Sequence, residues 1–207
     1  MAAPRPEADC VPYESDYESA PLFKIKASAG RRRVYLYKET KLCPGEQACA
    51  SRQKAYLVDG DIVFAGPVNQ GFRCSYYGTP KGKIIAGFIP DENLAPEKEQ
   101  PDLTSEFLVG KWRFEDDSIE IKPAGPGKVE AAGNAVYQTS MTENDGAFGA
   151  TAAVPGSGEL IFRDGEGDAM CEVKLHRRGP YLVASDNSQC GGMNVRFNGI
   201  YTKMPGK

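Results

Sequence analysis

The sequence predicts an all-β protein with two domains, and three observations lead to this prediction. Strand-like runs of β-branched and aromatic residues recur along the chain and are separated by Gly, Pro, Asn and Asp. No amphipathic segment of about 11 or more residues indicates a helix. A charged segment with two prolines, APEKEQPDLTSE, divides the runs into two groups.

The two groups define the expected domain organisation. We expect an extended tail over residues 1–22, a small barrel over 23–95, a linker over 96–106, and an antiparallel barrel or sandwich of seven or eight strands over 107–207. The chain has 207 residues, of which 41% are hydrophobic and 26% charged, so each domain can bury a core of its own.

Four runs carry the first domain: RVYLY, AYLVDGDIVF, GFRCSYY and GFIPDENL. Asp59-Gly60-Asp61 marks a turn within the second run, and DENL suits one helical turn. On these runs, residues 23–95 resemble the bacterial Src-homology-3-like family. That family usually has Gly-Trp in its last motif, where this chain has Gly87-Phe88. The resemblance implies a small barrel that binds peptides or cell-wall material, or that serves only as a spacer.

The second domain begins at FLVGKWRFED, and its strand-like runs alternate with period two. The motifs GKW, CEVKLHRRGPYLVASDN and CGGMNVRFNGIYTK resemble the C-terminal module of small exported proteins of Gram-negative bacteria. In outline the domain is also similar to the eight-stranded barrels of periplasmic lysozyme inhibitors, and GNAVY resembles their inhibitory loop. These resemblances imply export and a binding role.

Six cysteines suggest disulfides, because the chain has no Cys-x-x-Cys pair and only one histidine. Cys171 and Cys190 are the only cysteines of the second half, and we expect them to pair. In the first half we expect Cys43 with Cys49, around PGEQA, and Cys10 with Cys74. Pairing of Cys10 with Cys43 or Cys49 is the alternative.

Composition and the N-terminus indicate location and exclude some partners. The start, MAAPRPEADC, is typical of a mature sequence left by signal-peptide cleavage, with an initiator Met added. We therefore expect a periplasmic or secreted protein. A net charge of −3 argues against a nucleic-acid partner. No apolar stretch reaches the roughly 18 residues of a membrane-spanning helix.

The sequence patterns typical of catalytic sites are weak, so we expect that the protein is not an enzyme and binds no cofactor. His176 lies beside Arg177 and Arg178, and no serine or aspartate motif accompanies it. The acidic pairs in 115–117 and 143–145 are typical of solvated turns. Asp164, Glu166 and Asp168 resemble the start of a calcium loop, but the twelfth position is Leu175 instead of Glu, and we expect a hairpin turn with no metal.

The segment SDNSQCGGMNVRFNGIYTK is expected to form a structural clasp that closes the barrel. Asp186 and Asn187 end a strand, and Gly191-Gly192 permits unusual backbone torsions. Asn194 would satisfy backbone groups, while the residues directed into the core would be Val195, Phe197 and either Ile200 or Tyr201. A ligand-binding loop is the alternative.

These observations favour a non-catalytic binding protein of the cell envelope. It would inhibit, or give immunity to, a cell-wall-degrading enzyme such as a muramidase, or a secreted toxin. Because such enzymes are often basic, acidic turns would contact them: Asp116, Asp117, Glu143, Asp145, Asp164, Glu166 and Asp168. The alternative is a peptidoglycan-binding module whose groove is lined by Tyr35, Tyr37, Tyr76 and Phe88.

Overall fold

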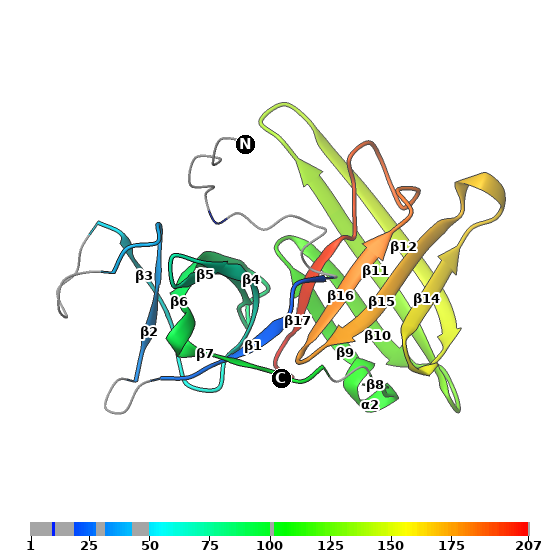
Figure 1. Ribbon diagram of the computed structural model, residues 1–207. Coiled ribbons are helices and arrows are strands. Elements are labelled where there is room, and N and C mark those ends of the chain that lie inside the picture. The colour runs from blue at the N-terminus through cyan, green and yellow to red at the C-terminus, as the bar shows by residue number, and fades with distance from the viewer. Residues whose placement is uncertain (1–9, 11–18, 28–31, 43–49, 100–101, 207) are drawn as a thin grey trace, which may run out of the picture. The chain divides into compact units, whose positions relative to one another are not determined.

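The computed structural model describes residues 10, 19–27, 32–42, 50–99 and 102–206 (Figure 1). It confirms the all-β class: one antiparallel sheet of seven strands forms a half-barrel, and a second of eight strands forms a nearly closed barrel. The chain divides into two compact units. Unit 1 comprises residues 1–77 and 85–98, and unit 2 comprises residues 78–84 and 99–207.

Unit 1 is built around a sheet with the strand order β3-β2-β6-β5-β4-β1-β7. Its strands are β1 (Leu22–Ile25), β2 (Val34–Tyr37), β3 (Arg52–Leu57), β4 (Ile62–Asn69), β5 (Phe72–Gly78), β6 (Ile84–Pro90) and β7 (Leu94–Pro96). The predicted helical turn is a short 3-10 helix, η1 (Asp91–Asn93). Strand β2 alternates between the two faces, because Val34 and Leu36 are buried while Tyr35 and Tyr37 are only half-buried.

The predicted turn at Asp59-Gly60-Asp61 connects β3 to β4. Gly60 has a φ of 91°, which favours glycine. Asp61 accepts a hydrogen bond from the backbone N–H of Val58 at 2.8 Å, and Asp59 accepts one from Ala27 at 3.0 Å. The two aspartates therefore fix the turn by bonding to backbone groups, as such residues commonly do.

A disulfide joins Cys10 to Cys74 on β5, which confirms the favoured pairing for these two residues. The pairing expected between Cys43 and Cys49 lies outside the described residues. Unit 1 is thus crosslinked across 64 positions of sequence, which restricts its unfolded chain.

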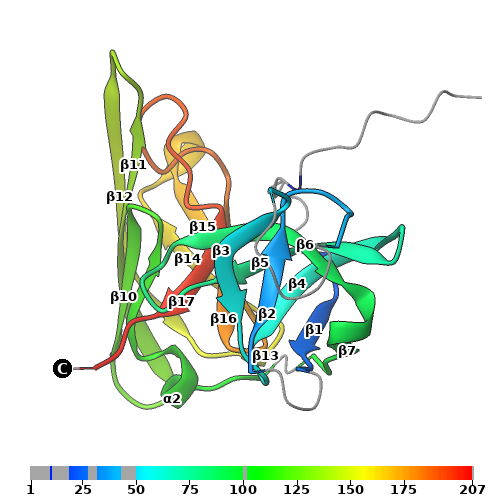
Figure 2. The ribbon, with the colours of Figure 1, turned by 90° about the vertical axis from the view of Figure 1, so that its left-hand side faces the viewer.

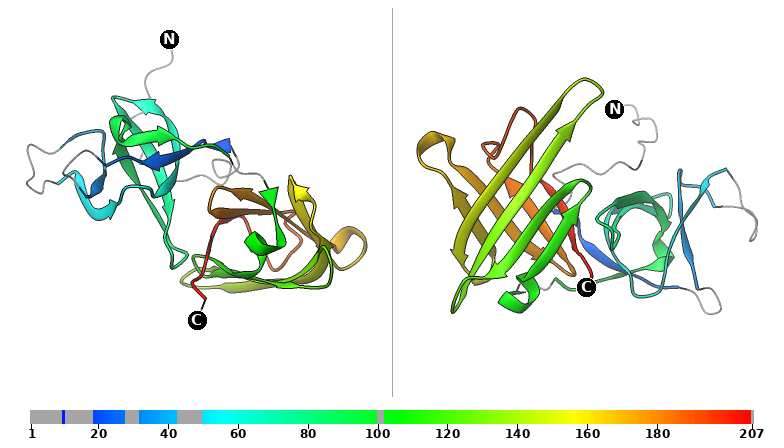
Figure 3. Two further views of the ribbon diagram at one scale, coloured as in Figure 1. Left: turned by 90° about the horizontal axis from the view of Figure 1, so that it is seen from below. Right: turned by 180° about the vertical axis from the view of Figure 1, so that it is seen from behind.

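Unit 2 contains the barrel, with the strand order β12-β11-β10-β9-β17-β16-β15-β14. Figure 3, right, shows β9 to β12 side by side. The strands are β9 (Gly110–Phe114), β10 (Asp117–Pro123), β11 (Lys128–Gln138), β12 (Glu143–Ala153), β14 (Glu159–Asp164), β15 (Cys171–Arg178), β16 (Tyr181–Asp186) and β17 (Gly199–Lys203). The two outer strands approach each other where the N–H of Gly149 on β12 donates to the Asp164 carboxylate on β14, at 2.8 Å.

Short elements precede the first barrel strand. Strand β8 (Asp102–Leu103) pairs with β13 (Gly156–Ser157), and the helix α2 (Ser105–Leu108) follows. The Thr104 hydroxyl caps the helix by accepting the N–H of Phe107 at 3.2 Å. The buried indole N–H of Trp112 donates to the Leu108 carbonyl at 2.8 Å, so α2 is attached to β9.

At alternate positions along each strand the side chains point inward, and they fill the interior of the second barrel. Ile119 and Ile121 of β10, Val129 of β11 and Phe148 of β12 are at most 4% exposed. Trp112 is 1% exposed, and it is the only tryptophan of the chain. Its fluorescence therefore reports on this barrel alone.

Candidate functional site

Four connections lie at one end of the second barrel, because consecutive antiparallel strands alternate in direction. They are the turns 115–116, 139–142 and 165–170 and the loop 187–198. Figure 1 shows this end at the top, with α2 at the opposite end, and Figure 2 shows the β11–β12 hairpin extending beyond the other strands. The 3-10 helix η2 (Gly167–Ala169) lies within the turn 165–170, between β14 and β15.

The acidic turns predicted to bind a partner all come to this end. We call this group the acidic end: Asp116, Glu143, Asp145, Asp164, Glu166 and Asp168. Five of the six are exposed, and Asp164 is half-buried because its carboxylate accepts the N–H of Gly149. The side chain of Asp116 is 85% exposed and lies 3.9 Å from the Arg113 guanidinium. Carboxylates that are up to 52 positions apart in sequence thus lie at one end of the barrel.

Asp117 differs from this group because its side chain is directed into the barrel and is 8% exposed. Strand β10 begins at Asp117, so this residue shares the inward face with Ile119 and Ile121. Its carboxylate accepts the N–H of Val136 at 2.9 Å. Burial, together with the nearby carboxylates of Asp116 and Asp186, raises its pKa from 3.8 to about 6. Asp117 is therefore not part of the exposed acidic surface.

Four exposed apolar side chains lie at the same end, and we call them the apolar rim. They are Val136 (40% exposed), Tyr137 (36%), Met141 (91%) and Met193 (78%). Three belong to the β11–β12 hairpin, and Met193 belongs to the loop 187–198. The Asn144 amide joins the two segments by donating to the Met193 carbonyl at 2.8 Å. Exposed methionines next to charged residues are typical of binding surfaces.

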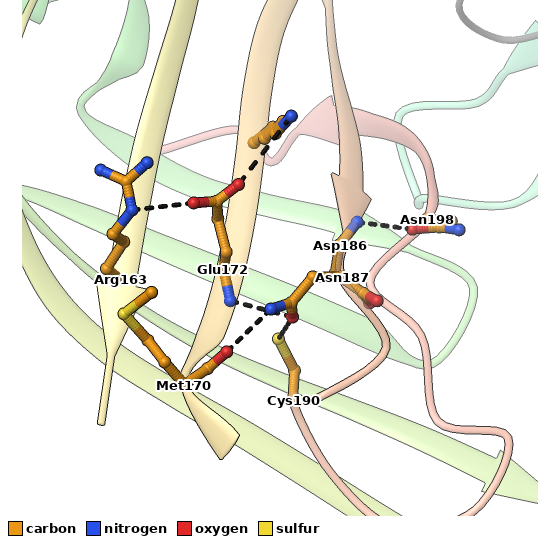
Figure 4. Close-up of polar contacts among 8 residues, drawn as sticks. Arg163, Met170, Glu172, Asp186, Asn187, Cys190 and Asn198 are labelled. Carbon is orange, nitrogen blue, oxygen red and sulfur yellow. Dashed lines mark hydrogen bonds and ion pairs between the residues drawn. The ribbon is translucent and has the colours of Figure 1, made fainter. Parts of the chain in front are cut away.

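The loop 187–198 is attached firmly to the strands beneath it, as Figure 4 shows. The Asn187 side chain accepts the N–H of Glu172 at 3.0 Å and donates to the Met170 carbonyl at 2.8 Å. The N–H of Asp186 donates to the Asn198 side chain at 2.8 Å. The disulfide Cys171–Cys190, predicted from sequence, closes the same loop. The clasp expected here is thus formed mainly by Asn187, Asn198 and the disulfide.

The loop also inserts side chains into the barrel. Val195 is 1% exposed and Phe197 is 0% exposed, and the Phe197 ring packs edge-on against Phe148 at 5.0 Å between centroids. Ile200 and Tyr201 are both buried. The loop therefore closes this end of the barrel, and Met193 lies on the side of the loop that faces the solvent.

The glycines of the loop have another role than the one expected. The left-handed backbone conformations are at Ser188 and Asn194, each with a φ of 68°, and not at Gly191 or Gly192. Gly191 pairs with Gly146 of β12, and a Cβ on Gly191 would lie 2.6 Å from the Gly146 Cα. Gly191 and Gly146 are thus both needed as glycines because the backbones of the loop and of β12 approach each other closely here.

This close approach gives a prediction for Gly146→Ala. The added Cβ would lie 2.3 Å from the Cys190 carbonyl oxygen, which is backbone and cannot rotate away. We expect a loss of about 1–3 kcal/mol in the free energy of unfolding, followed by urea titration with Trp112 fluorescence. Gly149→Ala on the same strand meets nothing within 4 Å and is the control. Equal stability of the two variants would contradict the prediction.

A buried polar group beneath the loop was not found from the sequence. The hydroxyl of Tyr201 is fully buried and has no hydrogen-bond partner among the described residues. Burial and the carboxylates of Asp117 and Asp186 raise the pKa of this hydroxyl well above its ordinary value. Asp186 accepts the N–H groups of Ser188 and Phe197, so it also holds the ends of the loop. Only the closed barrel brings these three residues together.

The groove residues proposed for unit 1 do not all reach the surface. Tyr76 is 5% exposed and Phe88 is 8% exposed, because both side chains pack inward. Tyr35 and Tyr37 are half-buried. Tyr35 instead pairs with Tyr56, which lies opposite it on β3, at 6.0 Å between ring centroids. The aromatic side chains of these strands that are at least partly accessible are Tyr35 and Tyr37 on β2, Tyr56 on β3 and Tyr77 on β5.

His176 is half-buried on β15, where it lies opposite Glu159 in the sheet register. Within the described part of the chain, no three His, Cys, Asp or Glu residues are placed to hold a metal ion.

Comparison with protein-family models, curated proteins and solved structures gives no match. No helix in the described residues is long and apolar enough to cross a membrane. The two disulfides found among the described residues indicate an oxidising, extracytoplasmic location.

Proposed function

We propose that this is an exported, non-catalytic binding protein that inhibits a basic cell-wall-degrading enzyme, and that the acidic end and apolar rim of the second barrel form the interface. The observation that carries the proposal is that these carboxylates and exposed apolar side chains, distant in sequence, meet at one end of the barrel. We place the protein in the periplasm or outside the cell.

The arrangement suits a protein partner with a cleft. Figure 2 shows that the β11–β12 hairpin projects from the barrel, and its turn carries Met141, which is 91% exposed. An apolar side chain on a projecting hairpin can enter a pocket and lose its contact with water. The surrounding carboxylates would attract a basic enzyme and increase the rate of association.

The scaffold favours recognition without a large rearrangement. The loop is fixed by a disulfide, by the Asn187 hydrogen bonds and by the buried Phe197. A surface that is already ordered loses little conformational entropy on binding, and this favours a tight complex. A non-catalytic role agrees with the exposure of five of the six acidic residues, which lie on the outside of the barrel in contact with water.

The first test is calorimetric titration of the protein with hen-type and goose-type lysozymes, which are basic muramidases, at low and moderate salt. We expect a one-to-one complex that weakens as salt increases. A variant with Glu143→Gln, Asp145→Asn and Met141→Ala should bind with roughly tenfold lower affinity.

A matched variant separates the interface from net charge. Glu130→Gln with Glu159→Gln removes two exposed carboxylates from other parts of the same barrel and should leave the affinity unchanged. Equal weakening in both variants would refute the assigned interface. If neither muramidase binds and the protein is instead retained by insoluble peptidoglycan, the inhibitor proposal fails.

A further inference from the structure

An aromatic and cationic ladder crosses the outer face of β2 and β3 in unit 1. The Arg33 guanidinium lies over the Tyr56 ring at 4.4 Å, and the Arg52 guanidinium lies over the Tyr35 ring at 4.4 Å. The two rings form an edge-on pair between them. The interaction with the Tyr35 side chain raises the pKa of the Arg33 guanidinium. The ladder thus holds two positive groups in defined positions.

The charge of this face has one sign. Lys54 is exposed and lies on β3 between Arg52 and Tyr56, in the stretch where the pairing with β2 shifts its register. The strands Val34–Tyr37 and Arg52–Leu57 contain no acidic residue. The nearby carboxylate of Asp59 is engaged by the Ala27 N–H. The two strands thus present positively charged side chains and no carboxylate of their own.

Strand β3 is also the last strand at one side of the seven-stranded sheet. Within the described residues, no other strand pairs with its outer edge. Such an edge presents backbone N–H and C=O groups that can pair with an added strand. Tyr56 and Val58 at this edge are 43% and 44% exposed.

We propose that β3 binds an extended acidic peptide segment, which adds to the sheet as a further strand along this edge. Side chains of the added strand would lie beside those of Arg52, Lys54 and Tyr56. The ligand has acidic side chains at alternate positions, which share one face of the added strand, and apolar side chains between them. This site is separate from the acidic end and does not depend on the function proposed for it.

The chemistry favours a peptide over a single-stranded nucleic acid. Nucleic acids bind sheet surfaces by stacking bases on open aromatic faces. Here one face of each tyrosine ring is covered by a guanidinium group. A guanidinium held over a ring can still donate to a carboxylate, so the ladder suits acidic side chains.

The test is fluorescence anisotropy of the full chain with a labelled 12-residue peptide of alternating Glu and Val, in the disulfide-bonded state. We expect saturable binding that falls roughly tenfold in Arg52→Gln with Lys54→Gln. The control, Lys24→Gln with Lys26→Gln, removes two positive charges from the β1 region of unit 1 and should bind as the unmodified protein does.

Two further probes address the mode of binding. A peptide of the same sequence with all of its backbone nitrogens methylated has no N–H group to donate along either edge and should lose binding. Equal binding of the methylated peptide would overturn strand addition. No binding of the Glu-Val peptide, or tighter binding of a 12-nucleotide oligo-dT, would overturn the acidic-peptide assignment.

Discussion

Replacing Asp117 by Asn should stabilise the second barrel at pH 7.5 and above. The buried carboxylate has a pKa of about 6 in the folded protein, against an ordinary value of 3.8. The folded state therefore holds this proton more tightly than the unfolded state does. The stabilisation that the protonated Asp117 gives to the folded state is fully present below pH 3.8, and it is lost as the pH rises through 6.

The size of the effect follows from the shift. A pKa difference of about two units, at about 1.4 kcal/mol each, corresponds to on the order of 3 kcal/mol. The asparagine keeps an oxygen that can accept the Val136 N–H, so the backbone hydrogen bond need not be lost. We therefore expect the free energy of unfolding of Asp117→Asn to exceed that of the unmodified protein by up to about 3 kcal/mol at pH 8. At pH 3.5 the two free energies should differ little.

Urea titrations between pH 3.5 and pH 8, followed by Trp112 fluorescence, measure this difference. The control is Glu130→Gln on β11, since this carboxylate is exposed and is not one of the groups that raise the pKa of Asp117. Two results would contradict the assignment of this effect to the buried Asp117 carboxylate. The difference in stability between Asp117→Asn and the unmodified protein would not change with pH, or the variant would be the less stable protein at pH 8.

The sequence was sufficient for the fold class because local patterns determine it. Period-two alternation and turn residues mark most strands, and the turn at Asp59-Gly60-Asp61 is found where its residues predict it. The disulfide Cys171–Cys190 was predictable because these are the only cysteines of the second half. The helix α2 was missed because four residues are too few to show a helical period, although Thr104 is a typical capping residue.

The candidate site was only partly predictable. The acidic turns are evident in the sequence, but Asp117 was grouped with them because its orientation depends on where β10 begins. Tyr76 and Phe88 illustrate the same limit, since alternation identifies one face of a strand without saying whether that face is buried. Met141 and Met193 are 52 positions apart, and nothing in their local sequence indicates that the barrel brings both to one end.

Removal of the Cys171–Cys190 disulfide is the second change expected to have a large effect. The bond closes a loop with a sequence separation of 19, for which the chain-entropy estimate gives about 3 kcal/mol. We expect Cys171→Ala with Cys190→Ala to lower the free energy of unfolding of the second barrel by about this amount. Alanine is the suitable replacement because both cysteines are at most 5% exposed, and serine would place unpaired hydroxyls in the core.

The same variant separates the scaffold from the interface. If the loop 187–198 presents Met193 to a partner, its release should also lower the affinity for a muramidase under conditions in which the barrel is still folded. Cys10→Ala with Cys74→Ala is the control, because that disulfide lies in unit 1 and should change neither the Trp112 unfolding transition nor the affinity. Undiminished affinity without Cys171–Cys190 would show that the loop contributes to folding alone, and would leave the interface to the β11–β12 hairpin and the acidic turns.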